Sequence, residues 1–220
     1  MQNAPIWSMQ IMSNPEVNDM PVCALDPVTR DCFNGDDMLG ITAQYYHGKG
    51  LRDEWRPAGL AYHRKDIGHV DWLESMAKSR RVFTVSSLIF VDKTVCDALM
   101  TFDLGDGRLS RMPIYQSDRK TEVDCDFYLL EFCNPRHTVD RDRTDRCRPL
   151  YKARPEAGYK LPSNLRGRDV VVHRSAQQGP DLWFDPMIRH YQFLSDGVAR
   201  VLIALGLEEK FNLNQCKFLY

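Results

Sequence analysis

The sequence lacks the segments that place a protein in or across a membrane. Nowhere do about 18 apolar residues follow one another, the length that a membrane-spanning helix needs. Residues 1–17 contain neither a basic region nor a continuous apolar run, so we expect no secretory signal. The sequence therefore predicts a soluble protein of the cytoplasm.

An excess of charge of one sign is also missing. The chain has 29 Lys and Arg against 30 Asp and Glu, which leaves a formal net charge of −1. Proteins that bind nucleic acids or anionic membranes usually carry a positive excess on the binding face. We expect neither a nucleic acid nor a membrane among the partners.

The sequence contains none of the short motifs that mark common nucleotide, nucleophile or metal sites. The P-loop and dinucleotide glycine patterns, G-x-S-x-G, C-x-x-C and H-E-x-x-H are all absent. The seven cysteines form no close pair, and the six histidines are scattered. We expect no metal, no cofactor, and mostly reduced cysteines that serve as small core residues in a reducing compartment.

Two carboxylates remain as candidates for chemistry. Asp124 and Asp126 alternate at the start of an apolar stretch and would point to one face of a strand, a geometry compatible with acid–base or metal chemistry. Acidic residues at strand ends are also common as capping or solubilising groups. We therefore expect no enzyme and assign no catalytic residue, and a hydrolase using Asp124 and Asp126 is the lesser alternative.

Two stretches of the sequence resemble each other. "IFVDKTVCDALMTFDL" in the middle of the chain aligns with "QFLSDGVARVLIALGL" near its end. Four positions are identical, pairing Phe90 with Phe193, Val95 with Val198, Leu99 with Leu202 and Leu104 with Leu207. Agreement in helix phase, cap and following turn favours a true internal repeat.

Each copy of the repeat predicts the same local structure. Asp92 and Ser195 stand just before a helical pattern of apolar residues, and both side chains accept hydrogen bonds from the N–H groups of a helix's first turn. An apolar run precedes each cap, and a turn and an alternating segment follow each helix. The repeat therefore predicts two similar units, each a strand, a capped amphipathic helix and a strand.

The rest of the chain predicts an α+β protein with mixed or antiparallel sheets and a few capped amphipathic helices. We expect an irregular N-terminal segment, residues 1–62, packed on a main domain of residues 63–220, with the whole forming one unit. Residues 34–50 carry turn signals and predict loops around one or two short strands. Further expected elements are a helix in "HVDWLESMAKS", a strand in "RRVFTVSSLIF", an edge or bulged strand in "LSRMPIYQ" and a central strand in "VDCDFYLLEFCNP".

A charge-dense stretch follows, from Arg136 to Asp169. Its Asp and Arg residues alternate in sign, and Pro155 and Pro162 interrupt it, which favours a long surface excursion with salt-bridged turns over a nucleic-acid site.

Two groups of residues are candidates for partner binding. Asp36 and Asp37 form an acidic pair that suits a basic partner, and the nearby aromatic group of Tyr45, Tyr46 and His47 suits an interface. Trp183 and Phe184 are better explained as core residues.

Several segments, taken in order, resemble immunity protein family 11 of bacterial polymorphic-toxin systems. The first motif of the family, which contains an aspartate, corresponds to Val70–Leu73, and its first helix corresponds to Asp92–Leu99. The Pro-containing strand corresponds to Arg111–Ile114, and the last conserved segment of the family corresponds to Asp181–Phe211. The resemblance extends over about residues 70–220, and its motifs are packing motifs. This chain departs from the family pattern with Asp92 and Thr144 in place of Ser, and Glu209 in place of Gly.

The resemblance implies a function by stoichiometric binding. Such a protein binds a cognate toxin domain one-to-one in the cytoplasm and blocks its active site. Because the surfaces that select a toxin vary within such a family, the resemblance assigns no binding residue. A scaffold or regulatory binding module is the other alternative to immunity.

Overall fold

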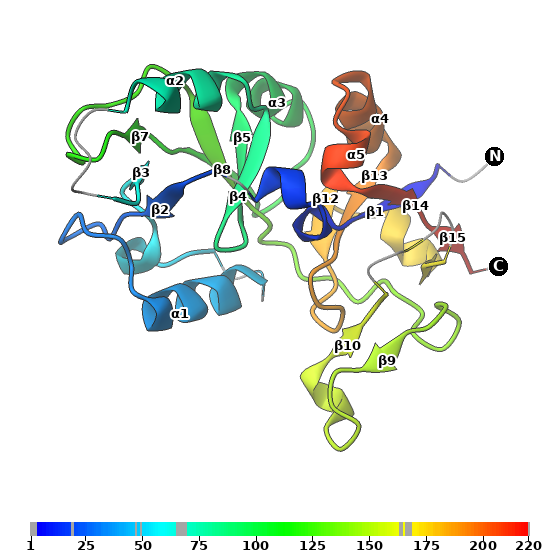
Figure 1. Ribbon diagram of the computed structural model, residues 1–220. Coiled ribbons are helices and arrows are strands. Elements are labelled where there is room, and N and C mark those ends of the chain that lie inside the picture. Colours follow the sequence, from blue (N-terminus) through cyan, green and yellow to red (C-terminus); the bar gives the residue numbers. More distant parts are fainter. Residues whose placement is uncertain are drawn as a thin grey trace.

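Two four-stranded antiparallel sheets form the frame of the protein (Figure 1). This computed structural model describes residues 4–18, 20–46, 48, 50–64, 70–162, 165 and 169–219. The first sheet has the strand order β4-β5-β8-β6, with β4 Val82–Val85, β5 Leu88–Asp92, β8 Phe127–Glu131 and β6 Arg108–Arg111. The second has the order β12-β13-β1-β14, with β12 Leu182–Phe184, β13 Gln192–Ser195, β1 Ile6–Met9 and β14 Leu213–Gln215.

Smaller sheets and five α-helices surround this frame within the described residues. The three-stranded sheet joins β2 Val22–Ala24, β3 Leu60–Tyr62 and β7 Ile114–Tyr115, and two-stranded pairs join β9 Arg148–Pro149 with β10 Tyr159–Lys160 and β11 Val171–Val172 with β15 Lys217–Phe218. The helices are α1 Gly35–Tyr46, α2 Asp71–Lys78, α3 Lys93–Leu99, α4 Asp196–Ala204 and α5 Glu208–Phe211. The α+β class expected from the sequence is confirmed.

The two large sheets share one plan. In each, a hairpin leads into a helix, the chain returns to an edge strand, and an antiparallel strand lies between the hairpin and that edge. The strand register agrees too. Asp92 lies opposite Phe127, the first residue of the central strand β8, and Ser195 lies opposite Ile6, the first residue of the central strand β1. The predicted pair of similar units is confirmed. The central strand β8 follows its own unit in the chain, whereas β1 comes from the N-terminus.

Both predicted helix caps are formed. A side-chain oxygen of Asp92 accepts the N–H of Val95 at 2.8 Å, and the Ser195 hydroxyl accepts the N–H of Val198 at 3.5 Å. These bonds satisfy donors that have no partner within a helix. The capped helices contact each other, and so the two units pack side by side.

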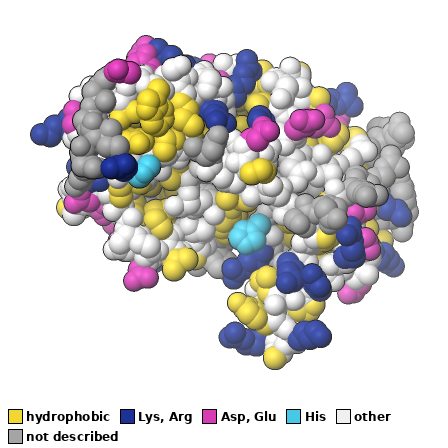
Figure 2. Space-filling view, viewed as in Figure 1, with side chains coloured by type: hydrophobic (Ala, Val, Ile, Leu, Met, Phe, Trp, Pro, Cys, Tyr) yellow, Lys and Arg dark blue, Asp and Glu magenta, His cyan; other side chains and the backbone are white. Residues whose placement is uncertain are grey.

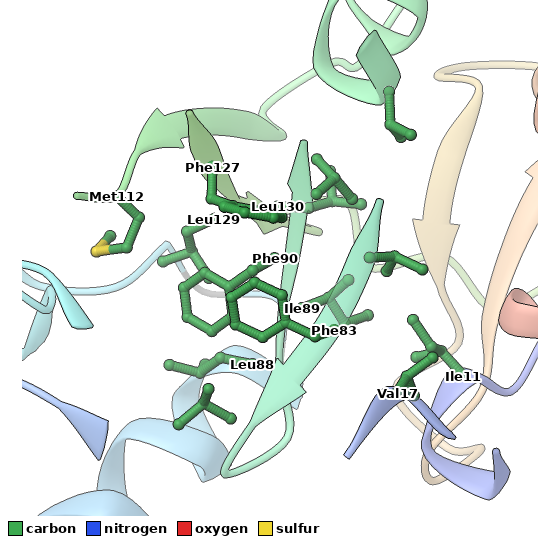
Figure 3. Close-up of a cluster of buried hydrophobic side chains, with 14 of the residues drawn as sticks. Ile11, Val17, Phe83, Leu88, Ile89, Phe90, Met112, Phe127, Leu129 and Leu130 are labelled. Atoms are coloured by element: carbon green, nitrogen blue, oxygen red, sulfur yellow. The ribbon is translucent and has the colours of Figure 1, made fainter. Parts of the chain in front are cut away.

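The largest buried cluster lies around the first sheet (Figure 3). Phe83 stacks on Phe90 across the β4–β5 hairpin with ring centroids 5.3 Å apart, and Phe127 of β8 meets Phe83 edge-on at 4.8 Å. Burial of side chains of this size contributes about 1.5–3 kcal/mol each. The central position of β8 agrees with its apolar sequence on both faces.

Polar bonds join the two units where the turn after α3 meets the start of β12. The Asn134 amide donates to the carbonyls of Leu104 and Leu182 at 2.7 and 2.8 Å, and its oxygen accepts the N–H of Asp106. Beside it, Asp103 and Asp181 bond reciprocally through backbone and side chain. The turn after α3 is therefore held against the start of β12.

The N-terminal region differs from the sequence prediction. Residues 34–50 were expected to form loops around short strands, but residues 35–46 form α1. Asn34 accepts the N–H of Asp37 at 2.9 Å, and two acidic residues lie in the first turn, where the helix dipole favours negative charge. The expected irregular segment of residues 1–62 in fact supplies β1, β2, α1 and β3, because pairing with distant strands orders short segments that carry little periodic signal.

Two strand predictions need refinement. "RRVFTVSSLIF" forms a hairpin rather than one strand, and its turn residues Ser86 and Ser87 both have positive φ, as tight hairpin turns require. "LSRMPIYQ" begins as the edge strand β6, as predicted, but at Pro113 the chain leaves for β7 in another sheet.

Most of the cysteines are free, as the sequence predicts, but one pair forms a disulfide. Cys23 and Cys32 form a disulfide with Cα atoms 5.6 Å apart, while the other five cysteines are free. The turn at residues 26–31 and the antiparallel bridge between Leu25 and Cys32 bring the two sulfurs together, a contact that their spacing in the sequence does not reveal.

Candidate partner-binding surface

The residues that the sequence marked for partner binding divide into different environments. Asp36 and Asp37 are exposed in the first turn of α1. Tyr45 is only 4% exposed, and its hydroxyl donates to the carbonyl of Leu130, so it is a core residue. Tyr46 is half-buried, and His47 lies outside the described residues.

One face of α1 borders a groove of about 330 Å³. The helix contributes Leu39, Thr42, Ala43 and Tyr46, whose spacing of three and four residues places them on one side. The opposite wall is the loop between β12 and β13, with Pro186, Ile188, Arg189 and His190. The α1 groove, as we name this hollow, is mainly apolar, and Leu39 at its rim is 71% exposed.

An aromatic pair forms one end of the α1 groove. The ring of Tyr46 meets that of His190 edge-on with centroids 5.1 Å apart, and the Tyr46 hydroxyl donates to the Ser87 carbonyl at 3.4 Å. Burial raises the pKa of Tyr46 to about 12, and burial together with nearby Arg189 lowers the pKa of His190. Both side chains are therefore neutral near pH 7, which keeps this end of the groove uncharged.

A hairpin-like projection adjoins the groove. Residues 148–160, which we name the basic arm, contain β9 and β10 and extend below the body in Figure 1, and Figure 2 shows Lys and Arg side chains gathered on this projection. Tyr159 of the arm donates its N–H to the Met187 carbonyl at 2.7 Å and accepts the N–H of Arg189 at 3.0 Å. These two bonds attach the arm to the loop that lines the groove.

The basic arm carries charge that the rest of the molecule does not neutralise. Four of its residues are basic and one, Glu156, is acidic. The four basic residues are Arg148, Lys152, Arg154 and Lys160. Within the described part of the chain, neither these four residues nor Arg189 makes an ion pair with a carboxylate. The arm and Arg189 thus form a locally positive surface on a chain of nearly zero net charge.

The preceding turn behaves differently, as the sequence predicted. Arg143 pairs with Asp140 at 3.0 Å, and Arg146 pairs with Asp145 at 2.8 Å and Asp169 at 3.3 Å. The predicted salt-bridged surface is therefore confirmed for residues 140–146. Sequence reasoning missed the arm because it treated residues 136–169 as one balanced stretch, although the acidic residues are concentrated in its first third and at its end.

Asp124 and Asp126 contact different cations. Asp124 pairs with Lys78 at 2.9 Å, and Asp126 pairs with Arg111 at 3.3 Å. Their side chains are 90% and 52% exposed. Cys125 between them is partly buried, and burial raises the pKa of its thiol to about 12. The arrangement is that of surface ion pairs beside an unreactive thiol.

A search of the described residues for three or more clustered His, Cys, Asp or Glu side chains with metal-binding geometry found none. In the same part of the chain, the helices are too short or too polar to cross a membrane. Trp183 and Phe184 are core residues, 1% and 4% exposed, as expected.

Comparison with protein-family models and with curated proteins found no match to this chain. The α1 groove and the basic arm are therefore identified as the candidate site from their geometry alone.

Proposed function

We propose that the protein is an immunity protein that binds and neutralises a cognate toxin domain one-to-one. The observation that carries this proposal is the α1 groove beside the basic arm, where an exposed apolar side chain, a hollow and unpaired charges adjoin. Partner surfaces commonly combine an apolar centre with a charged rim. The order of packing motifs that resembles immunity protein family 11 supports the same function.

Inhibition by occlusion requires a broad contact and no catalytic group on the inhibitor. Tight protein inhibitors bury about 1,600 Å² in total and depend on a few buried anchors. Leu39 and Tyr46 on α1 and Tyr151 on the basic arm, which is 55% exposed, are the anchors we assign. Asp36 and Asp37 complete the surface as contacts to a basic group of the toxin.

Co-expression tests the function. The open reading frame next to this gene is induced alone and together with this protein, and growth and co-purification are followed. We expect the neighbour to stop growth, and this protein to restore it within a stable one-to-one complex. A neighbour that is harmless, or toxic but neither bound nor neutralised, rejects the proposal in favour of a scaffold or regulatory module.

Replacement of Asp36 and Asp37 by Ser tests the acidic contact separately. We expect the double variant to bind the toxin more weakly and with a smaller dependence on salt, because a charge pair is lost at the rim. Unchanged affinity and salt dependence would remove this acidic pair from the interface.

We also propose a cytoplasmic location, although the Cys23–Cys32 disulfide is a feature more common in oxidising compartments. Fractionation of the native cells decides between the cytoplasm and an exported location.

A further inference from the structure

We infer that the α1 groove and the basic arm together bind an acidic segment of a protein, with an apolar side chain in the groove and carboxylates against the arm. The inference rests on the proposed function for the identity of that protein. The chemistry of the segment rests on the arrangement of charge and apolar surface described above.

The first step concerns the charges of the arm. Arg148, Lys152 and Arg154 are exposed and make no ion pair within the described chain, whereas the nearby Arg143 and Arg146 do. Unpaired cations on one projection attract an acidic partner over a distance of about 10 Å at moderate salt. The arm is therefore suited to carboxylates supplied from outside the molecule.

The second step concerns the connection between the arm and the groove. Tyr159 of the arm bonds to both Met187 and Arg189 through its backbone, and Ile188 between them lines the groove. Charged and apolar contacts are thus attached to the same loop. A short segment that places its carboxylates on the arm therefore also reaches the groove.

The third step distinguishes a protein segment from a nucleic acid. Nucleic-acid surfaces use aromatic faces to stack bases. Here the guanidinium of Arg154 lies over the Tyr151 ring at 5.1 Å and that of Arg141 over the Tyr159 ring at 4.7 Å, so one face of each ring is occupied. The adjoining hollow is apolar and rimmed by the exposed Leu39, which suits an aliphatic or aromatic side chain and not a phosphate.

The charge order along the surface places the apolar anchor of the segment at one end of its acidic stretch. The acidic pair Asp36 and Asp37 lies in the first turn of α1, Leu39 follows one turn later, and Arg189 and the arm adjoin the other wall of the groove. An acidic stretch is favoured on the arm and disfavoured beside Asp36. The apolar anchor therefore precedes or follows the acidic stretch and does not interrupt it.

A direct binding measurement tests this inference without the toxin. The probe is a fluorescein-labelled peptide in which a Leu–Phe pair adjoins a run of Glu and Asp. The comparison probes are the same peptide with Lys at every acidic position and an oligouridylate of equal length. Binding to the purified full chain is followed by fluorescence anisotropy at low and moderate salt.

Three variants accompany the wild type. The arm variant carries Arg148→Glu, Lys152→Glu and Arg154→Glu, and the groove variant carries Leu39→Asp. The control variant carries Lys120→Glu, Arg174→Glu and Lys217→Glu, which makes the same change in net charge at exposed residues of other elements. All substituted positions are exposed, and circular dichroism and urea unfolding verify that each variant is folded.

We expect only the acidic peptide to bind. The arm and groove substitutions should each weaken this binding at least about tenfold, and the control substitutions should leave it unchanged. Several results overturn the inference. These are preference for the Lys peptide or the oligouridylate, no binding of the acidic peptide, or equal loss in the control variant. A wild type that is dimeric by light scattering, and that Leu39→Asp makes monomeric, also overturns it, because a second copy then fills the groove.

The toxin complex provides the link to the proposed function. If the neighbouring gene product is toxic and neutralised, the arm variant is expected to lose neutralisation while the control variant retains it. Retention by the arm variant rejects the inference and leaves the immunity function intact. A harmless neighbour rejects the immunity function, while the peptide result stands independently.

Discussion

Individual polar residues hold the core of the first sheet to its surroundings, and Glu131 is the clearest example. Its side chain is 1% exposed, accepts the N–H of Leu51 at 2.8 Å and lies 3.5 Å from the guanidinium of Arg56. Asn134 plays a comparable part where the two units meet. Such residues are costly to remove because their partners are left without a bond in a buried place.

We expect substitutions of Glu131 to separate the contribution of its charge to stability from the contribution of its hydrogen bond. Glu131→Gln keeps an acceptor for Leu51 and should lower the free energy of unfolding by about 1–2 kcal/mol. Glu131→Leu removes the acceptor as well and should cost about 3 kcal/mol. Urea unfolding measures both. A Leu variant as stable as the wild type would show that the buried pair does not stabilise the fold.

Because Asp92 caps a helix with a titratable side chain, we expect the stability of the fold to depend on pH. Burial raises the pKa of Asp92, so its contribution favours folding most at low pH, where the carboxyl is protonated, and declines as pH rises through the folded-state pKa. Asp92→Asn keeps an acceptor for Val95 without a charge, and should be at least as stable as the wild type at pH 7. Asp92→Ala should cost about 1 kcal/mol at the same pH. Thermal unfolding between pH 3 and 7 checks this, and an Asn variant as unstable as Ala would contradict it.

At the scale of elements, glycines in the helices have opposite roles. A Cβ atom on Gly35, at the start of α1, has no other atom within 4 Å. A Cβ atom on Gly197, in the first turn of α4, lies 2.9 Å from the Phe102 ring. The close approach of the segment after α3 to α4 therefore depends on Gly197, whereas Gly35 costs only backbone entropy.

We expect the two glycines to respond in opposite directions. Gly35→Ala should raise the free energy of unfolding by about 0.4–1 kcal/mol, because it restricts the unfolded chain. Gly197→Leu should lower it by about 1–3 kcal/mol, because the larger side chain overlaps Phe102. Denaturant unfolding of both variants tests the contact between the units, and an unchanged Gly197→Leu variant would show that the units separate easily.

At the scale of the whole molecule, the N-terminus completes the C-terminal sheet. β1 lies between β13 and β14 and pairs with both, so the second unit is assembled from the two ends of the chain. The polypeptide therefore cannot be divided after residue 62 without removing the middle of a sheet.

Removal of residues 1–18 tests this arrangement. We expect the shortened chain to lose cooperative unfolding and to lose slow hydrogen exchange in β13 and β14, because an unpaired strand position exposes backbone groups on both sides. The matched control replaces the tip of the basic arm, residues 151–157, by a short Gly-containing turn. That variant should retain the exchange protection of both large sheets.

The disulfide gives a further test at this scale. Denatured, unreduced protein should expose five reactive thiols, and reduction should raise the count to seven. Replacement of both Cys23 and Cys32 by Ser should lower the free energy of unfolding by about 2–3 kcal/mol, because the unfolded chain loses a short closed loop. Thiol labelling with mass spectrometry measures the number of reactive thiols, and seven thiols without reductant would contradict the presence of the disulfide.

The sequence by itself determined the features that depend on neighbouring residues. The caps Asp92 and Ser195, the helix phases after them and the apolar strand at residues 127–131 were all predicted and observed, because capping and periodicity act within a few residues. The charge alternation at residues 140–146 was predicted as ion-paired for the same reason.

Only the tertiary structure decided which distant segments meet. It placed β1 between β13 and β14, joined Cys23 to Cys32, buried the Tyr45 side chain of α1 in the core and set the groove face of that helix against the loop beside the basic arm. Each of these contacts joins segments whose own patterns are weak, and their pairing depends on the burial of both surfaces together. The candidate site is of this kind, since one wall comes from residues 39–46 and the other from residues 186–190.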